Sequence, residues 1–262
     1  IEDEVRGYST LKLGATFVLG SDEVRSFRFT EVRKAKTRYS YNVPRDLFDA
    51  SIARVAERSG VQIVRETAKL ERVPGSERLV LAPESLAACR EALGGEPDLI
   101  VDAGGRPRLI PNLLELPFET GSRKDTALFA HCDDVAQVVE GDVHIDRLER
   151  GWSWRIPLPG KMSVGLVIDS DFIKKFGESS EEQFDTYLKH DPMIVRWGPA
   201  PRRLSPVLKF TAYQLVTTRA VGDGWVLLGD SFGFVDPVFS SGLLLAFDGA
   251  KRLSKAILAG GS

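Results

Sequence analysis

The stretch that decides the fold is residues 224–242, GWVLLGDSFGFVDPVFSSG. Its opening apolar run, Trp225 to Leu228, is typical of a strand buried in a parallel sheet, and an acid, Asp230, follows after one glycine. A loop containing glycine, proline and serine comes next, and residues 243–258 then carry apolar side chains at helical spacing. A buried strand, a loop and a helix in this order predict one half-unit of an α/β fold.

Two earlier segments have residue patterns that are also typical of an α/β fold. Residues 44–60 show helical spacing after a proline, and residues 61–64 alternate as a strand would, so the two predict a helix that feeds a strand. Residues 98–105, DLIVDAGG, form an apolar run that ends in Asp102 and glycines. This run predicts a strand that is buried on both faces.

The region between residues 105 and 224 has a different residue pattern, which is typical of antiparallel strands. Three runs of alternating residues, joined by Gly151 and by Pro159-Gly160, predict an antiparallel meander with strands at 143–148, 152–158 and 162–168. Strands are also expected near the start of the chain, at residues 16–19, 27–30 and 39–43. The predicted architecture is therefore an α/β domain that is interrupted by an antiparallel sheet domain near residues 111–220.

The composition excludes several classes of protein. The 262 residues are 43% hydrophobic and 27% charged, which is ordinary for a globular protein and excludes wholesale disorder. The formal net charge of −2 does not indicate nucleic-acid binding, and no apolar run is long enough to predict a transmembrane segment. Two cysteines and three scattered histidines predict neither a disulfide framework nor a metal site, and the expected compartment is the cytoplasm.

The chemistry of the deciding stretch points to a bound ligand. An acid at the carboxyl end of a buried strand lies where open α/β sheets bind ligands, and the carboxylate of Asp230 can accept hydrogen bonds from paired hydroxyls of a sugar or ribityl chain. The backbone N–H groups of Ser240, Ser241 and Gly242, at the start of the next helix, attract an anion. The same pattern also fits a purely structural arrangement in which Ser240 or Ser241 caps the helix.

Four motifs resemble those of FAD-dependent halogenases and their aromatic hydroxylase relatives, and they occur in family order. Gly229-Asp230 with residues 236–242 looks like the flavin-contacting segment, and residues 39–47 resemble the strand-Arg-helix element. Residues 101–106 resemble the VDASGR element, with Gly104 where serine is usual. Residues 152–157 match WxWxIP, which marks flavin-dependent halogenases, although two tryptophans at this spacing are also common in the core of a sheet.

The resemblance implies a glutathione-reductase-like, Rossmann-like FAD-binding domain with an inserted antiparallel sheet domain for the substrate. Residues 1–43 would supply strands that face the substrate domain, residues 44–110 and 221–262 would form the FAD-binding domain, and residues 111–220 the substrate domain. The residues implied for cofactor binding are Arg45, Asp102, Gly104, Asp230, Gly233, Pro237 and Gly242. The amides of Ser241 and Gly242 would hold a halide, and the motif residues are Trp152, Trp154, Ile156 and Pro157.

The implied activity is halogenation of an electron-rich aromatic compound. FADH2 supplied by a flavin reductase, O2 and chloride or bromide would give hypohalous acid, which travels to a substrate in a separate pocket. Tryptophan halogenases carry a catalytic glutamate where this chain has Phe239, so the resemblance favours a phenol or pyrrole, free or tethered to an acyl or peptidyl carrier protein.

The sequence leaves other functions open. It contains no GxGxxG phosphate loop, and both that loop and the family's catalytic lysine would precede Ile1, so no lysine is assigned here. An FAD-dependent monooxygenase that hydroxylates its substrate, or an isoprenoid reductase of the same fold, is the main alternative. A non-catalytic fragment is the second.

Overall fold

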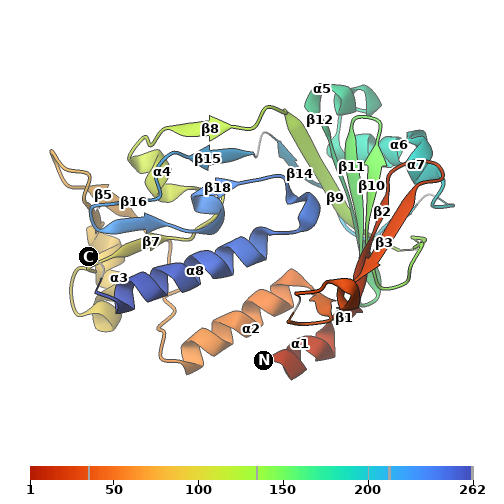
Figure 1. Ribbon diagram of the computed structural model, residues 1–262. Helices are drawn as coiled ribbons and strands as arrows, with labels where there is room; N and C mark the ends of the chain where they lie inside the picture. The colour runs from red at the N-terminus through yellow and green to blue at the C-terminus, as the bar shows by residue number, and fades with distance from the viewer. Residues whose placement is uncertain (35, 134, 200, 212–213, 261–262) are drawn as a thin grey trace. The chain divides into compact units, whose positions relative to one another are not determined.

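The computed structural model describes residues 1–34, 36–133, 135–199, 201–211 and 214–260, and it divides into two compact units (Figure 1). Unit 1 consists of residues 1–61 and 123–212, and unit 2 consists of residues 62–122 and 213–262. Each unit has its own sheets and its own cluster of buried hydrophobic residues.

Unit 1 is built on an eight-stranded mixed sheet with the order β13-β9-β12-β11-β10-β2-β3, in which β14 also pairs with β9. The meander predicted from the sequence is present as β10, β11 and β12, which pair antiparallel. The sheet is not wholly antiparallel, because β10 and β2 run parallel. Its strands are β2 (Gly14–Val18), β3 (Val24–Arg28), β9 (Asp125–Asp133), β10 (Val143–Leu148), β11 (Gly151–Leu158), β12 (Lys161–Asp169), β13 (Arg202–Arg203) and β14 (Leu208–Thr211).

The remaining elements of unit 1 are short strands and helices. Strands β1 and β4 form a separate two-stranded sheet. Helix α6 starts at a capping box formed by Ser179 and Glu182, and it buries Phe184 and Leu188 in the core cluster that also contains sheet residues such as Leu166. The bounds are α1 (Glu2–Tyr8), β1 (Thr10–Lys12), β4 (Ser40–Asn42), α2 (Arg45–Arg58), α5 (Ser170–Ile173), α6 (Ser180–His190) and α7 (Pro192–Val195).

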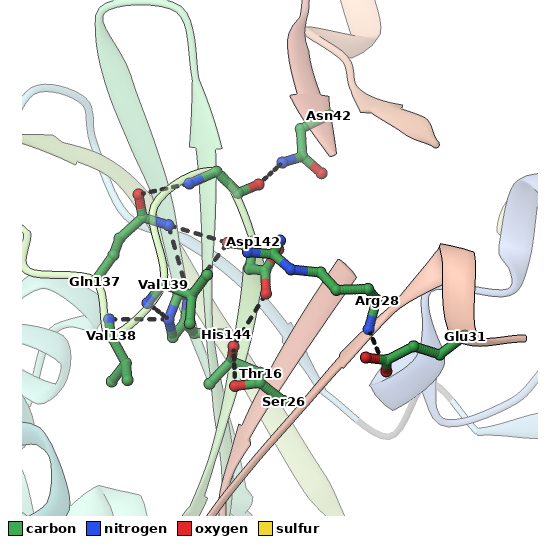
Figure 2. A network of polar contacts seen from close by, with 11 residues as sticks. Thr16, Ser26, Arg28, Glu31, Asn42, Gln137, Val138, Val139, Asp142 and His144 are labelled. Atoms are coloured by element: carbon green, nitrogen blue, oxygen red, sulfur yellow. Dashed lines mark hydrogen bonds and ion pairs between the residues drawn. The ribbon is translucent and has the colours of Figure 1, made fainter. Parts of the chain in front are cut away.

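A network of polar side chains attaches the loop before β10 to neighbouring strands (Figure 2). The ring of His144, which is fully buried, accepts hydrogen bonds at Nε2 from the backbone N–H groups of Val138 and Val139, at 3.0 and 3.2 Å. Its Nδ1 therefore carries the proton and donates to the carbonyl of Asp142 at 3.1 Å. The Asp142 carboxylate in turn accepts from Thr16 on β2 and pairs with Arg28 on β3. The loop is thus held by groups that need a neutral histidine.

Unit 2 contains two three-stranded sheets and one two-stranded sheet. In the sheet β16-β17-β7, β17 and β7 run parallel. The buried hydrophobic cluster of unit 2 includes Trp225 and Leu227 from this sheet and Ile110. The second sheet has the order β18-β15-β8, and the third pairs β5 with β6. The strands are β5 (Leu70–Arg72), β6 (Leu79–Leu81), β7 (Ile100–Asp102), β8 (Phe118–Thr120), β15 (Leu215–Thr217), β16 (Val221–Gly222), β17 (Trp225–Leu227) and β18 (Gly233–Phe234). The helices are α3 (Pro83–Leu93), α4 (Leu109–Leu113) and α8 (Gly242–Leu258), with 3-10 turns η3 (Gly229–Ser231) and η4 (Pro237–Phe239).

The division into units differs from the domain boundaries expected from the sequence. Residues 44–61, which were expected in the FAD-binding part, lie in unit 1, where α2 follows β4 directly. Residues 111–122 and 213–220, which were expected in the substrate domain, lie in unit 2, because β8 and β15 pair there with each other and β15 with β18. The functions assigned to these domains stay predictions.

Several local predictions are wrong for identifiable reasons. No strand forms at residues 61–64, where no neighbouring strand provides hydrogen-bond partners among the described residues. Strand β3 ends at Arg28, because Phe29–Glu31 form a 3-10 turn. Strand β7 is not buried on both faces: Ile100 and Asp102 share the face toward the interior, and Val101 on the other face is 41% exposed.

No helix in the described ranges is both long enough and apolar enough to cross a membrane.

Candidate cofactor site

The parallel pair β7 and β17 brings two acidic segments of the sequence to one edge of a sheet. Leu227 lies opposite Asp102, and the N–H of Leu228 donates to the Asp102 carbonyl at 2.9 Å. The carboxyl ends of both strands therefore meet, and the loops that begin at residues 103 and 229 leave from the same edge. This is the place where open α/β sheets bind ligands.

Asp102 shapes this edge through its own backbone contacts. The side chain is buried, and its two oxygens accept from the N–H groups of Gly104 at 3.0 Å and Ile110 at 2.9 Å. A Cβ on Gly104 would lie 3.2 Å from the Asp102 carboxylate, so the loop closes tightly around it. These contacts give Asp102 a role in holding the loop and the start of α4, and its predicted contact with a cofactor stays a prediction.

The turn η3 carries Asp230 out from the strand end. Asp230 is half-buried, and its neighbour Ser231 is fully buried. The Ser231 hydroxyl lies within hydrogen-bond distance of the carbonyls of Leu228, at 2.7 Å, and of Asp102, so it ties η3 to the ends of both strands. Sequence reasoning missed this role of Ser231. The available signal was a small hydroxyl side chain directly after the Gly-Asp pair.

Gly233 has a structural reason to be glycine. It pairs with Val216 across β18 and β15, and a Cβ at this position would come within 2.9 Å of the Val216 Cα. No side chain can be accommodated without moving that strand. The close approach that the sequence indicated at Gly233 is therefore made at least in part by the chain itself.

The turn before α8 presents backbone N–H groups rather than a side-chain cap. Asp236 accepts from the N–H of Val238 at 3.1 Å and so fixes η4, which begins at Pro237. Ser240 has a φ of 53°, and Ser241, the N-cap residue of α8, makes no capping hydrogen bond through its side chain. The alternative in which Ser241 caps the helix is therefore wrong.

The start of α8 can hold an anionic group. The first N–H groups of a helix have no partner within the helix, and the helix dipole adds positive potential there. Apart from its chain neighbours and the backbone of α8 itself, no described atom lies within 4 Å of the position that a Cβ would take on Gly242, so the backbone can be approached closely. These features fit the anionic edge of a reduced flavin or a halide, and Asp230 lies in the same unit at the neighbouring strand end.

Arg45 is not part of this arrangement within unit 2. It is exposed on α2 in unit 1, where it forms an ion pair with Asp49 one helical turn later, at 3.1 Å. Its predicted contact with a cofactor stays a prediction.

The tryptophan motif lies on β11 in unit 1. Trp152, Trp154 and Ile156 are half-buried on one face of the sheet, whereas Pro157 is buried on the other. The Trp154 indole N–H donates to the Ser163 hydroxyl at 3.1 Å, and the ring lies across Gly165, where a Cβ would clash with it at 2.0 Å. The neighbouring strand β12 therefore fixes the orientation of Trp154.

Behind the motif, β11 carries a buried ion pair that the sequence analysis did not identify. Arg155 and Asp146 form a bidentate pair, with Nη2 and Oδ1 2.8 Å apart, and both side chains are almost completely buried. Burial raises the pKa of Asp146, and the Arg155 guanidinium partly offsets this rise. Sequence spacing does not reveal the pair, because its members lie on adjacent strands.

In the part of the chain that the structure describes, no three potential metal ligands among histidine, cysteine, aspartate and glutamate gather at one point.

Comparison with known proteins relates most of the chain to one family. The sequence profile of the tryptophan halogenase family matches residues 14–261. A tryptophan 2-halogenase from Chondromyces crocatus is 30% identical over 241 residues, which cover 87% of this chain and 46% of that protein. A 1H-pyrrole-2-carbonyl-(peptidyl-carrier protein) chlorinase from Pseudomonas fluorescens is 26% identical and covers 84% of this chain and 51% of its own length. This chain thus spans about half the length of these curated relatives.

Solved structures show the same fold. The myxobacterial chondrochloren halogenase, a variant of the FAD-dependent halogenases, matches with a TM-score of 0.80 and 25% identity over 100% of this chain and 62% of that chain. A halogenase solved with phloroglucinol and FAD matches with a TM-score of 0.75 and 19% identity over 97% of this chain and 54% of that one. These likenesses confirm the predicted α/β fold class, a Rossmann-like FAD-binding fold combined with a sheet domain.

Proposed function

Because the chain belongs to the tryptophan halogenase family, we propose that the protein is an FAD-dependent halogenase that uses reduced flavin, O2 and chloride or bromide to halogenate an electron-rich aromatic compound. The proposal is supported most directly by one observation. The half-buried Asp230 follows the carboxyl end of β17, and α8, whose start has no side-chain cap, lies in the same unit with Ala246 3.7 Å from the position of a Cβ on Gly229. This combination supplies donors for an anionic ring edge or halide and an acceptor for hydroxyls.

Reduced FAD, when bound, would supply the electrons that activate O2 for oxidation of the halide. Asp230 would accept hydrogen bonds from ribityl hydroxyls and so orient the cofactor along the strand ends. Pro237 would pack against the flat ring, and the amides of Ser241 and Gly242 would hold negative charge beside it. Ser231 and Asp102 would act indirectly, because their contacts keep the two loops in position.

We propose a phenol or pyrrole as the substrate, free or tethered to a carrier protein. Phe239, at the position where tryptophan halogenases carry their catalytic glutamate, is 76% exposed and offers no carboxylate to activate an indole. The Pseudomonas fluorescens relative acts on a pyrrole bound to a peptidyl carrier protein, which supports this class of substrate. A flavin reductase that delivers FADH2 would be the functional partner.

Titration with FAD tests the cofactor assignment. The full-length protein should bind FAD, and Asp230→Ala should weaken binding at least tenfold, because the hydroxyl acceptor is lost. Asp223→Ala, on an exposed turn of the same unit, serves as the matched control and should leave the affinity unchanged. Equal affinities for wild type and Asp230→Ala would contradict the assignment, and a full-length protein that binds no FAD would support a non-catalytic role.

A product assay tests the reaction. Reduced FAD, O2 and either chloride or bromide are supplied with a panel of phenols, pyrroles and indoles, and the products are identified by mass. We expect products whose mass depends on the halide, formed from a phenol or pyrrole in preference to an indole. Hydroxylated products alone at saturating halide would instead identify a monooxygenase.

A further inference from the structure

Unit 2 contains a second candidate binding site, a pocket of about 470 Å³ lined by residues between positions 108 and 118. Its charged lining residues are Arg108 and Glu115, and its aromatic lining residue is Phe118. Neither the residues predicted to bind the cofactor nor those predicted to bind halide line this pocket. An inference about it therefore does not depend on the proposed halogenase activity.

Arg108 is a buried cation with few partners. The residue is only 7% exposed, and its Nη2 donates to the Thr217 hydroxyl at 2.6 Å. Its Nε is buried without an acceptor, and no carboxylate among the described residues lies within ion-pair distance of the guanidinium. Several of the five N–H donors of this side chain are thus left without an acceptor from the described chain.

The charge of Arg108 is only partly compensated. Burial lowers its pKa, and the nearby Asp102 carboxylate offsets this effect incompletely. Asp102 also accepts from two backbone N–H groups, so its charge is shared with the loop that it holds. A buried cation in this situation is costly, because the desolvation of the guanidinium is not balanced by a paired anion. An anionic ligand would supply the missing partner.

We infer that this pocket binds a small organic monocarboxylate with a flat apolar part. The Nη2 group of this guanidinium donates to Thr217, and its Nη1 group, which makes no hydrogen bond to the described residues, can donate to a carboxylate oxygen of a ligand. Phe118 is 53% exposed, its ring lies 5.2 Å from the Arg108 guanidinium carbon, and it provides a surface for the flat part of the ligand. The Glu115 carboxylate on the lining disfavours a doubly charged phosphate and so favours a single negative charge.

Isothermal titration of the full-length protein tests this site with three probes: benzoate, its neutral analogue benzamide, and inorganic phosphate. Benzoate should bind, and Arg108→Met should weaken that binding at least tenfold. Arg108→Lys keeps the charge but not the planar guanidinium, and it should weaken benzoate binding less than Arg108→Met does. Arg90→Met, the same substitution at an exposed position of unit 2, is the matched control and should not change benzoate binding. Thermal unfolding of each variant without ligand shows whether it is folded.

The outcomes are distinguishable. Benzoate binding that depends on Arg108, together with at least tenfold weaker binding of benzamide, supports the site. Binding that is unchanged in Arg108→Met places benzoate elsewhere and overturns the inference, and phosphate binding tighter than benzoate overturns the choice of a monocarboxylate. If Arg108→Met does not fold, Thr217→Val is measured in its place, because it removes the acceptor that orients the guanidinium. Thr217→Val should weaken the binding of benzoate. An unchanged affinity of this variant for benzoate would also overturn the inference.

Discussion

The sheet of unit 1 and helix α8 of unit 2 are both rich in apolar side chains, but only the sheet buries them. Leu166 and Ile168 on β12 are fully buried under the short helices of their unit. Helix α8 contains no buried residue, and Leu244 and Leu258 on it are 70% and 84% exposed. Helical spacing of apolar residues predicts that a helix forms, whereas the extent of its burial depends on which elements pack against it.

Buried charges differ between the units in the same way. In unit 1, Asp146 is neutralised by a side chain, Arg155, on the adjacent strand. In unit 2, Asp102 is held by backbone N–H groups, and Arg108 has no carboxylate within ion-pair distance among the described residues. The buried Asp146 of unit 1 is thus paired with a charged side chain, whereas the buried Arg108 of unit 2 keeps an Nε donor without an acceptor among the described residues. This is the pattern expected where a protein receives ligands.

The largest expected effect contrasts two leucines. Leu166→Ala should lower the free energy of unfolding by about 2–5 kcal/mol, because it removes buried methyl groups and leaves a cavity. Leu244→Ala should change it by no more than about 0.5 kcal/mol, because most of that side chain already contacts solvent. Urea unfolding followed by far-UV circular dichroism measures both variants. Equal losses would show that the apolar side chains of α8 are buried in solution.

A second prediction concerns the pH dependence of unit 1. Burial, with a smaller effect of Arg155, lowers the pKa of His144 to about 4 from its usual value of about 6.5. The unfolded chain therefore takes up the proton first as the pH falls. The stabilisation is complete above about pH 6.5 and is lost progressively toward pH 4, by roughly 3 kcal/mol.

The stability lost as the pH falls from 7 to 4 should be much smaller in His144→Gln, whose side chain does not titrate. Urea unfolding at a series of pH values between 7 and 4 measures it, and His190→Gln, at an exposed ring on α6, is the matched control that should keep the wild-type dependence. Parallel pH profiles for wild type and His144→Gln would show that the network in Figure 2 does not depend on a neutral histidine.

The smallest expected effect on stability separates the two possible roles of Arg45. Arg45→Ala should cost about 0.3–0.5 kcal/mol, because it removes only an exposed ion pair within a helix. If Arg45 contacts the cofactor as predicted, FAD should nevertheless bind about five- to tenfold more weakly. FAD titration measures this, with Arg58→Ala, an exposed arginine on the same helix, as the control. An unchanged affinity would assign Arg45 to the surface alone.

Local sequence patterns predicted several strands and helices correctly. The strands expected at residues 143–148, 152–158 and 162–168 correspond to β10, β11 and β12, and the helix expected at residues 243–258 corresponds to α8. The strand expected at residues 61–64 failed, because alternation shows that a segment can pair but does not provide a partner. The parallel pairing of β10 with β2 also escaped prediction, since it joins segments far apart in the chain.

The candidate cofactor site shows the same limit. The resemblance pointed to Asp230, Ser241 and Gly242, and all three belong to unit 2, while their contact with a cofactor stays a prediction. The sequence motifs did not show that the Ser231 hydroxyl links the ends of two strands. They also did not show that the pairing of β18 with β15 requires a glycine at position 233. Those roles depend on atoms contributed by other segments.

The amino-acid order by itself determined the alternation of α/β and sheet segments, the acid at the end of a buried strand and the family to which the chain belongs. These follow from local spacing and from residue types at given positions, which need no knowledge of distant neighbours. Only the tertiary structure decided that Asp102 holds its own loop, that Arg155 and Asp146 are paired and that Arg108 has no carboxylate within ion-pair distance among the described residues. Electrostatic balance depends on which charges lie within a few ångströms, and that is settled when distant strands are brought together.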